Sequence, residues 1–205
     1  MWTIEETTLT PLRVQTSRLE LVEVTPELAK ANLDDVALLA RLLDARIPAT
    51  WPPEHWEPEA IRWLLGLAQR NQHDRGWGAW YVVCREGDGL SSAGAAGAAG
   101  PTFRRTLIGT CGVKGPPDAQ GVIEVGYGIV SECQRRGFAS EATSALIDWA
   151  LRDARVKMIT AETFPHLVPS LGVMRRLGMQ MIGDGSEPGV VRYGVTREEW
   201  EGVAR

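Results

Sequence analysis

The feature that most constrains the fold lies in the middle of the chain, where a strand-like segment leads within a few residues into a helical one. Residues 121–130 read GVIEVGYGIV, a run rich in β-branched residues and typical of a strand. Residues 137–154 then place apolar side chains at helical spacing. Because Gly137 stands at the junction, we expect a strand, a tight turn and a helix in direct succession.

This junction predicts a binding site for an anion. The first amides of a helix have no acceptor within it, and the helix dipole adds about half a positive charge there. Gly137 and the small Ala139 would let a diphosphate approach the backbone, while Arg135 and Arg136 add positive charge. The alternative is an ordinary strand-to-helix turn without a ligand.

The rest of the chain alternates strand and helix patterns. Strands are expected at 18–24, 80–84, 106–113, 157–163, 179–182 and 190–195, and helices within 25–43, 57–68 and 170–177. Residues 87–100, GDGLSSAGAAGAAG, have too few apolar side chains to offset the entropy of ordering and should form a flexible loop. The length of 205 residues fits a single domain.

Composition excludes several classes of protein. The net charge of −4 lacks the basic excess of nucleic-acid binders, and no apolar run is long enough to span a membrane. The three cysteines have no CxxC spacing, which disfavours disulfides and zinc and favours a reducing, cytoplasmic setting. The three histidines lack ligand spacing, so we expect no metal.

Four motifs resemble the GNAT superfamily of acetyltransferases, in its RimJ/RimL-like branch that acts on ribosomal proteins and small amines. The turn Gln134-x-x-Gly137-x-Ala139 is similar to that superfamily's pyrophosphate loop for acetyl-CoA. The strand at 124–127, the helix start at 140–142 and the segment 169–179 resemble the same branch, in the same order. The resemblance is close over residues 105–195 and looser back to residue 12.

The resemblance implies an α+β fold, an α/β/α sandwich. Its mixed, mostly antiparallel central sheet would have about seven strands, splay at the cofactor site and be flanked by about four helices. Residues 1–205 would form one GNAT domain. Within it, residues 12–80 would supply the first strand and the acceptor-side helices, 87–100 the flexible loop, and 105–195 the acetyl-CoA-binding core.

The resemblance also implies an N-acetyltransferase that passes acetyl directly from acetyl-CoA to a primary amine in a ternary complex. An ammonium with a pKa near 10 must lose a proton before it can attack, so a base is needed. Glu124, in an otherwise apolar strand, lies close to the spacing of the superfamily's glutamate base. The alternative is a glutamate that faces solvent or pairs with an arginine.

The leaving thiolate needs a proton donor, and here the chain departs from the common pattern. The superfamily's Asn and Tyr positions correspond to Leu167 and Met174, neither of which can donate a proton. In the branch that the chain resembles, the helix-starting serine has this role, which points to Ser170. A helix N-cap is the alternative role for that serine. Tyr127 or water could then protonate the thiolate.

The remaining expectations concern binding. The cofactor is expected to contact Ile129, Val130, Ser131, Gln134, Arg135, Arg136, Gly137, Phe138, Ala139 and Ser140. The acceptor is expected to contact Trp51, Trp56 and Tyr127, and would be a protein N-terminus or a small amine.

A homodimer is compatible with this branch. The alternative function is a non-catalytic acyl-CoA-binding sensor or interaction module on the same fold.

Overall fold

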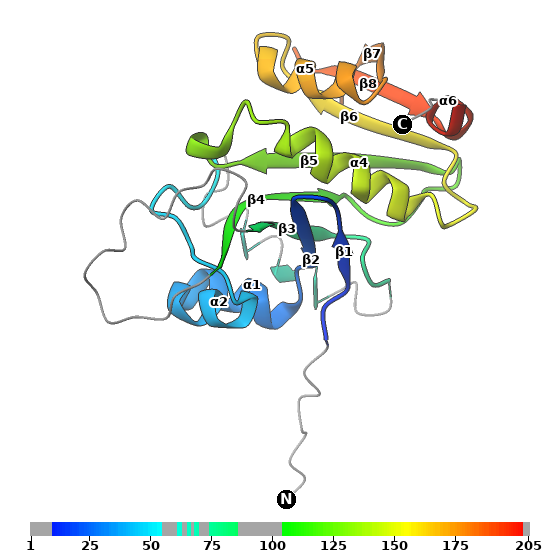
Figure 1. Cartoon of the computed structure of the whole chain (residues 1–205). Helices are drawn as coiled ribbons and strands as arrows, with labels where there is room; N and C mark the ends of the chain where they lie inside the picture. The colour runs from blue at the N-terminus through cyan, green and yellow to red at the C-terminus, as the bar shows by residue number, and fades with distance from the viewer. Residues whose placement is uncertain are drawn as a thin grey trace, which may run out of the picture.

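The computed structural model describes residues 10–54, 61–62, 65–66, 68–69, 74–85 and 104–202. These residues form one eight-stranded sheet in the order β1-β2-β3-β4-β5-β6-β8-β7 (Figure 1). The strands are β1 (Arg13–Gln15), β2 (Leu19–Glu23), β3 (Ala79–Arg85), β4 (Arg105–Val113), β5 (Val122–Ile129), β6 (Met158–Thr163), β7 (Gln180–Asp184) and β8 (Val191–Thr196). Only β5 and β6 pair in parallel; the other neighbours are antiparallel. The predicted mixed, mostly antiparallel sheet is therefore confirmed.

Five α-helices have both ends within the described residues. They are α1 (Pro26–Asp34), α2 (Val36–Leu43), α4 (Phe138–Ala150), α5 (Val168–Arg176) and α6 (Arg197–Gly202). Residues 61–62, 65–66 and 68–69 are also helical, as expected for the segment 57–68. The segment 87–100 lies outside the described residues.

The single helix predicted within residues 25–43 is two helices in the structure, α1 and α2. Asp35 interrupts the pattern within 25–43 with an extended backbone, and its carboxylate accepts a hydrogen bond from the amide of Leu38 at 2.9 Å, which caps α2. Thr25 caps α1 in the same way, with Pro26 in the first turn. Strand β1 and helix α6 were not predicted, because elements of three and six residues are too short to show a period.

The sheet has a hydrophobic core on each face. Helix α4 lies along β5 on one face (Figure 1), where it covers residues such as Leu21 and Ile123. Helices α1 and α2 pack against Val22, Tyr81 and Leu107 on the other face. Neighbouring residues such as Leu21 and Val22 therefore serve opposite layers, as strand alternation requires.

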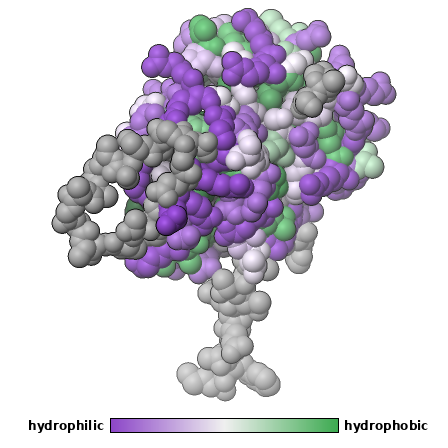
Figure 2. Space-filling model, viewed as in Figure 1, coloured by the Kyte–Doolittle hydropathy of each residue, from purple (hydrophilic) through white to green (hydrophobic). Residues whose placement is uncertain are grey.

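The outer surface on the α4 side is mostly hydrophilic (Figure 2). Large apolar side chains are exposed at the end formed by α5 and β7, where Val168, Met181 and Ile182 are 68%, 57% and 47% exposed. Within the described residues, no helix is both long enough and apolar enough to cross a membrane.

Candidate active site

The sheet splits between β5 and β6. In the part of the chain that the structure describes, the two strands pair only from Val122 to Glu124. The amide of Val130 donates to the carbonyl of Ile108 on β4 at 2.9 Å. Because amides of successive strand residues point to opposite sides, the amide of Ile129 faces away from β4 and into the split.

A sharp turn joins β5 to α4. The 3₁₀ turn η1 (Ser131–Cys133) comes first, and the side chain of Gln134 then donates to the carbonyl of Ile129 at 3.0 Å. Arg135 and Gly137 both adopt left-handed backbone conformations, with φ of 59° and 81°. Gly137 is the N-cap of α4 and offers no side chain to the helix amides, so these remain available to a ligand.

Positive charge converges on this turn. The amide of Glu141 donates to the carbonyl of Gly137 at 3.0 Å, so the amides of residues 138–140 precede the first bond of the helix. A Cβ atom built at Gly137 would lie 3.6 Å from Nη2 of Arg18 and 3.8 Å from Nη1 of Arg176. Helix amides, the helix dipole and two guanidinium groups thus favour a diphosphate at this point.

Arg18, which directly precedes β2, fixes the turn in place. Its Nε and Nη2 atoms lie 2.7 and 2.6 Å from Oε2 of Glu141, and its Nη1 donates to the carbonyl of Arg136 at 3.1 Å. The guanidinium also lies 4.5 Å from the ring centre of Phe138. Burial alone would raise the pKa of Glu141, but hydrogen bonds from Thr16 and Arg18 outweigh it and lower this pKa. The turn is therefore braced by an ionised carboxylate.

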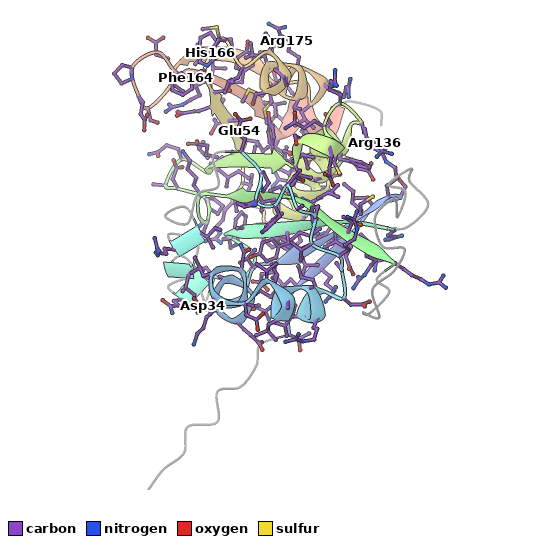
Figure 3. The ribbon with its side chains drawn as sticks, turned by 90° about the vertical axis from the view of Figure 1, so that its left-hand side faces the viewer. Asp34, Glu54, Arg136, Phe164, His166 and Arg175 are labelled. Carbon is purple, nitrogen blue, oxygen red and sulfur yellow. The ribbon has the colours of Figure 1, made fainter. Side chains whose placement is uncertain are left out.

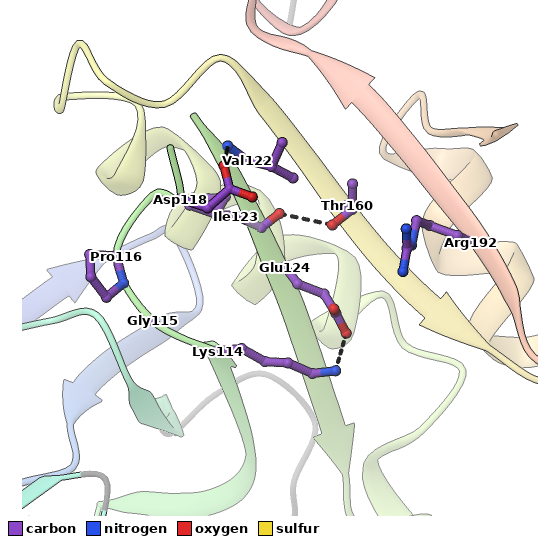
Figure 4. Close-up of a pocket in the computed structure, with 9 residues that line it drawn as sticks. All are labelled: Lys114, Gly115, Pro116, Asp118, Val122, Ile123, Glu124, Thr160 and Arg192. Atoms are coloured by element: carbon purple, nitrogen blue, oxygen red, sulfur yellow. Dashed lines mark hydrogen bonds and ion pairs between the residues drawn. The ribbon is translucent and has the colours of Figure 1, made fainter. Parts of the chain in front are cut away.

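Glu124 stands where the split begins, on the face of the sheet opposite α4. Its neighbours Ile123 and Val125 belong to the core beneath α4, so alternation directs Glu124 to the other side. Its carboxylate forms an ion pair with the ammonium of Lys114, which follows β4 directly (Figure 4). The Glu124 side chain is 22% exposed, so solvent and ligands can reach it.

Glu124 and Lys114 line a cleft of about 460 Å³. Its walls also include Ala79, Cys111, Gly112, Val113, Val125, Gly126, Tyr127, Glu162, Thr163, Phe164, Leu167, Ser186, Glu187 and Val190. The same pair borders a second hollow of about 290 Å³, which extends towards Thr160 and Arg192 (Figure 4). The lining residues of the larger cleft include three carboxylates and one ammonium, and the rest of its wall is mostly apolar.

The loop from β6 to α5 forms part of the rim of this cleft. Phe164 is 41% exposed and stacks on His166, with ring centroids 5.4 Å apart. Figure 3 shows these two residues together at one side of the molecule and Arg136, from the turn before α4, at the other. The rim of the cleft and the turn before α4 therefore lie on different sides of the molecule.

Glu162 on β6 shares the face of Glu124, since the parallel register pairs Glu124 with Thr160, two residues before it. It accepts from Nε of Arg192 at 2.8 Å and from the Ser186 hydroxyl at 2.6 Å. Burial alone would raise the pKa of Glu162, but the hydrogen bonds from Ser186 and Arg192 and the charge of Arg192 lower it to about 2. Glu162 is therefore a fixed negative charge in the cleft wall.

Tyr127 and Ser170 meet across the split. The Tyr127 hydroxyl donates to the main-chain carbonyl of Ser170 at 3.0 Å and lies 3.3 Å from its Oγ. Burial raises the pKa of Tyr127, although its hydrogen bond with Ser170 acts in the opposite direction. The phenol therefore keeps its proton at neutral pH, and it lines the cleft.

The other expected acceptor residues occupy different places. Trp51 packs edge-on against Tyr81 with ring centroids 5.8 Å apart, and its indole N–H donates to Asn32 at 2.9 Å. It is not among the described residues that line the cleft. Trp56 lies outside the described residues.

The expected cofactor residues gather at the end of the split. Val130 is buried at the end of β5, Ser131 opens η1, Phe138 and Ser140 are buried in the first turn of α4, and Ala139 is partly buried between them. Cys133 is also buried there, and burial raises the pKa of its thiol, which leaves the thiol protonated and a poor nucleophile. No group of three or more His, Cys, Asp and Glu side chains in the described ranges is arranged to hold a metal.

Three residues of the site were not singled out from the sequence. Lys114 and Glu162 reach the cleft only through the pairing of β4, β5 and β6, and Arg18 reaches the turn from more than a hundred residues away. Glu162 did carry a signal, because it is the one carboxylate in its strand, as Glu124 is in β5.

Comparisons with known proteins agree with this geometry. A family model described as an acetyltransferase (GNAT) domain matches residues 18–180. The chain is 25% identical over 165 residues to an uncharacterized N-acetyltransferase of Bacillus subtilis, YjdG. The aligned residues make up 80% of this chain and 88% of that protein.

Two solved structures share the fold. A ribosomal-protein alanine acetyltransferase from Vibrio fischeri superposes with a TM-score of 0.60 at 18% identity, over 92% of this chain and 98% of that one. A RimL ribosomal α-N-protein acetyltransferase in complex with coenzyme A gives 0.59 at 16% identity, over 90% of this chain and 98% of that one.

A split mixed sheet with a glycine turn before its central helix thus defines an acyl-CoA-dependent acetyltransferase fold. The family match covers well over half of the sequence. The chain belongs to the GNAT acetyltransferases and is an acetyl-transferring enzyme, in a family whose members use acetyl-CoA.

Proposed function

We propose that this enzyme transfers acetyl from acetyl-CoA directly to a primary amine while both are bound. The observation that carries the proposal is the split between β5 and β6, which has an anion-binding turn at one end and Glu124 at the other. Acetyl-CoA would enter from the α4 side and the amine from the cleft on the opposite side. Both substrates would then meet along the unpaired edge of β5.

The turn at residues 134–140 would hold the pyrophosphate of coenzyme A. A Cβ at Gly137 would lie in contact with the guanidinium groups of Arg18 and Arg176, so the glycine leaves that space open for a phosphate. The pantetheine arm would pair with the open edge of β5, and the amide of Ile129 would donate to the thioester oxygen. A preorganised donor of this kind contributes about 3–4 kcal/mol when negative charge develops on that oxygen.

Glu124 would take the proton from the acceptor ammonium. It is the carboxylate at the point where the split begins, it is partly shielded from solvent, and it already binds an ammonium in the form of Lys114. An incoming amine would replace that ammonium at the carboxylate and lose a proton to it. Glu162, held in its ionised form by Ser186 and Arg192 and paired with the guanidinium of Arg192, would not compete as a base.

The Tyr127–Ser170 pair would return a proton to the thiolate. Tyr127 lines the cleft and is protonated at neutral pH, and Ser170 lies within reach of its hydroxyl. A thiol with an ordinary pKa near 8.5 is a good leaving group, so the proton donor has a modest task.

The acceptor would be a protein N-terminus or a small amine. The cleft offers carboxylates for the ammonium and an apolar wall for the group that carries it. Two of the structurally similar enzymes are named as acetyltransferases of ribosomal proteins, and one of these names specifies an α-N-protein target, which makes a peptide with a free N-terminus the first acceptor to try.

The test is release of free coenzyme A measured against a panel of amines and N-terminal peptides. Thiol should appear only when an acceptor is present, and Glu124→Gln should lower kcat/KM about 10²- to 10⁴-fold, the usual contribution of a general base. Glu198→Gln, an exposed carboxylate on α6, is the matched control and should keep full activity. Binding of coenzyme A without turnover of any amine would favour the non-catalytic sensor instead.

A further inference from the structure

The chain contains only three lysines, Lys30, Lys114 and Lys157, among its 22 basic residues. All three are exposed. Only Lys114 lies in the cleft, on the strand edge next to the proposed base. Exposure alone would therefore make the three amines similarly reactive towards a thioester, and any preference must come from the site.

Lys114 is fixed opposite Glu124 by the sheet itself. Its amide donates to the carbonyl of Glu124 at 3.0 Å, which continues the β4–β5 ladder by one residue beyond Val113 and Val125. Residues paired across a ladder point their side chains to the same face. The ammonium accordingly meets the Glu124 carboxylate in an ion pair.

The position of this ammonium is the one that the reaction requires of an acceptor. An acceptor nitrogen must lie within hydrogen-bond reach of the base and open onto the thioester. The Lys114 ammonium already contacts Glu124, and its side chain shares the cleft with Val125 and Tyr127 on the unpaired part of β5. Its side chain is 61% exposed, so its four-carbon stem is free to swing along the cleft.

We propose that the enzyme acetylates its own Lys114 when no other amine occupies the cleft. The inference rests on the proposed function, because it uses Glu124 as base and acetyl-CoA as donor. Glu124 accepts a proton from the Lys114 ammonium, and the freed amine attacks the thioester carbonyl carbon. The C–N bond forms, the C–S bond breaks, and its electron pair leaves on the sulfur of coenzyme A.

The step balances without a further reactant. The attacking nitrogen loses its second proton, which ends on the thiolate, and Glu124 passes the first proton to water. The products are Nε-acetyl-lysine at position 114 and the free thiol of coenzyme A. Acetylation removes the positive charge that faces Glu124, so the modified enzyme has a cleft lined by three carboxylates and no ammonium among the described residues.

The experiment incubates the full-length enzyme with acetyl-CoA and no acceptor, then maps acetylated peptides by mass spectrometry. Lys114 should be acetylated at least about 100-fold faster than Lys30 and Lys157, at the low end of the contribution of a general base. The rate per enzyme molecule should not depend on enzyme concentration, since the reaction occurs within one chain. Equal labelling of all three lysines would overturn the proposal.

Variants separate this reaction from general chemical acetylation. Glu124→Gln should reduce labelling of Lys114 to that of the other two lysines. Lys114→Arg, which keeps a cation beside Glu124, should lose the fast phase, whereas a Lys30→Arg/Lys157→Arg variant should keep it. Persistence of fast Lys114 labelling in Glu124→Gln would contradict the proposal.

The same preparation is assayed for amine acetylation, so that a failure of the self-acetylation proposal can be distinguished from a failure of the proposed function. If amines are acetylated with a requirement for Glu124 but Lys114 stays unlabelled, self-acetylation is wrong and the proposed function stands. If neither reaction occurs although coenzyme A binds, the proposed function is wrong as well. A good acceptor amine should also slow the labelling of Lys114, because both compete for one carboxylate.

Discussion

The Tyr127 hydroxyl donates a hydrogen bond to the main-chain carbonyl of Ser170 at 3.0 Å, which joins the unpaired part of β5 to the first turn of α5. This contact bridges the two halves of the split sheet directly beside the cleft. It also brings together the two side chains that we propose as proton donors to the thiolate. In the proposed mechanism, the pair would therefore connect the architecture of the split with the last chemical step.

Replacement of Tyr127 by phenylalanine tests this connection. If the phenol supplies the proton, Tyr127→Phe should lower kcat about 100-fold, the lower end of the range for a general acid. Because the ring remains, the cleft should keep its shape, and KM for the amine should change little. A stopped-flow measurement of thiol release gives the step directly, and an unchanged kcat would assign the proton to water.

Ser170→Ala is the matched variant. Loss of one neutral hydrogen-bond partner costs about 0.5–1.5 kcal/mol, so we expect a decrease in kcat of about tenfold or less. A larger decrease than that of Tyr127→Phe would make Ser170 itself the acid. The two single variants and the double variant together form a thermodynamic cycle for the pair.

Gly137→Ala tests the phosphate-binding turn. With φ of 81°, a side chain at this position costs about 1–2 kcal/mol in backbone strain, and its methyl group would point between Arg18 and Arg176. Affinity for coenzyme A, measured by isothermal titration calorimetry, should fall at least about tenfold. Gly172→Ala in α5, where a Cβ meets nothing within 4 Å, should leave that affinity unchanged. Equal binding by both variants would mean that the cofactor lies elsewhere.

Arg18→Met should destabilise the turn at 134–140 without adding a side chain at Gly137. The guanidinium holds Glu141 and the carbonyl of Arg136, and loss of charged hydrogen bonds of this kind costs about 1.5–3 kcal/mol of stability. Removal of a positive charge near Gly137 should also lower coenzyme A affinity about tenfold and make it less dependent on salt. Arg155→Met, which removes an exposed arginine bonded to Asp153, should change neither quantity.

Much of the site was predictable because it is local in sequence. The turn at 134–140 follows its strand and precedes its helix without interruption, so the sequence located the helix start whose amides we propose as the phosphate site. Thr25 and Pro26 likewise marked the start of α1. Asp35 is also a capping residue, but apolar residues at helical spacing occur on both sides of the Asp34-Asp35 pair, so the two helices were read as one.

The rest of the site depends on which strands pair and in what register. Lys114 faces Glu124 only because β4 and β5 are antiparallel, and Glu162 shares their face only because β6 is parallel to β5. Gly109 illustrates the same limit, since a Cβ there would lie 2.2 Å from the carbonyl oxygen of Gly128 on the adjacent strand. The order of residues in the sequence does not show which residues of neighbouring strands come into contact.

Glu162→Gln gives a prediction for stability against pH. The pKa of Glu162 falls from its ordinary value of 4.5 to about 2 in the folded protein, so its ionised form stabilises the fold above pH 4.5. That contribution is lost progressively as pH falls from 4.5 through about 2, because the unfolded chain takes up the proton first. The variant should therefore be less stable than the parent near neutral pH, and the gap should shrink in acid.

Urea denaturation near neutral pH and at about pH 3 measures this gap. We expect a difference of about 1.5–3 kcal/mol near neutral pH, the value of a charged hydrogen bond, and a clearly smaller one in acid. Arg192→Met removes one of the two residues that lower this pKa and should show the same trend, with a smaller change because the hydrogen bonds from Ser186 remain. A gap of equal size at both pH values would mean that Glu162 contributes by packing and hydrogen bonding rather than by its charge.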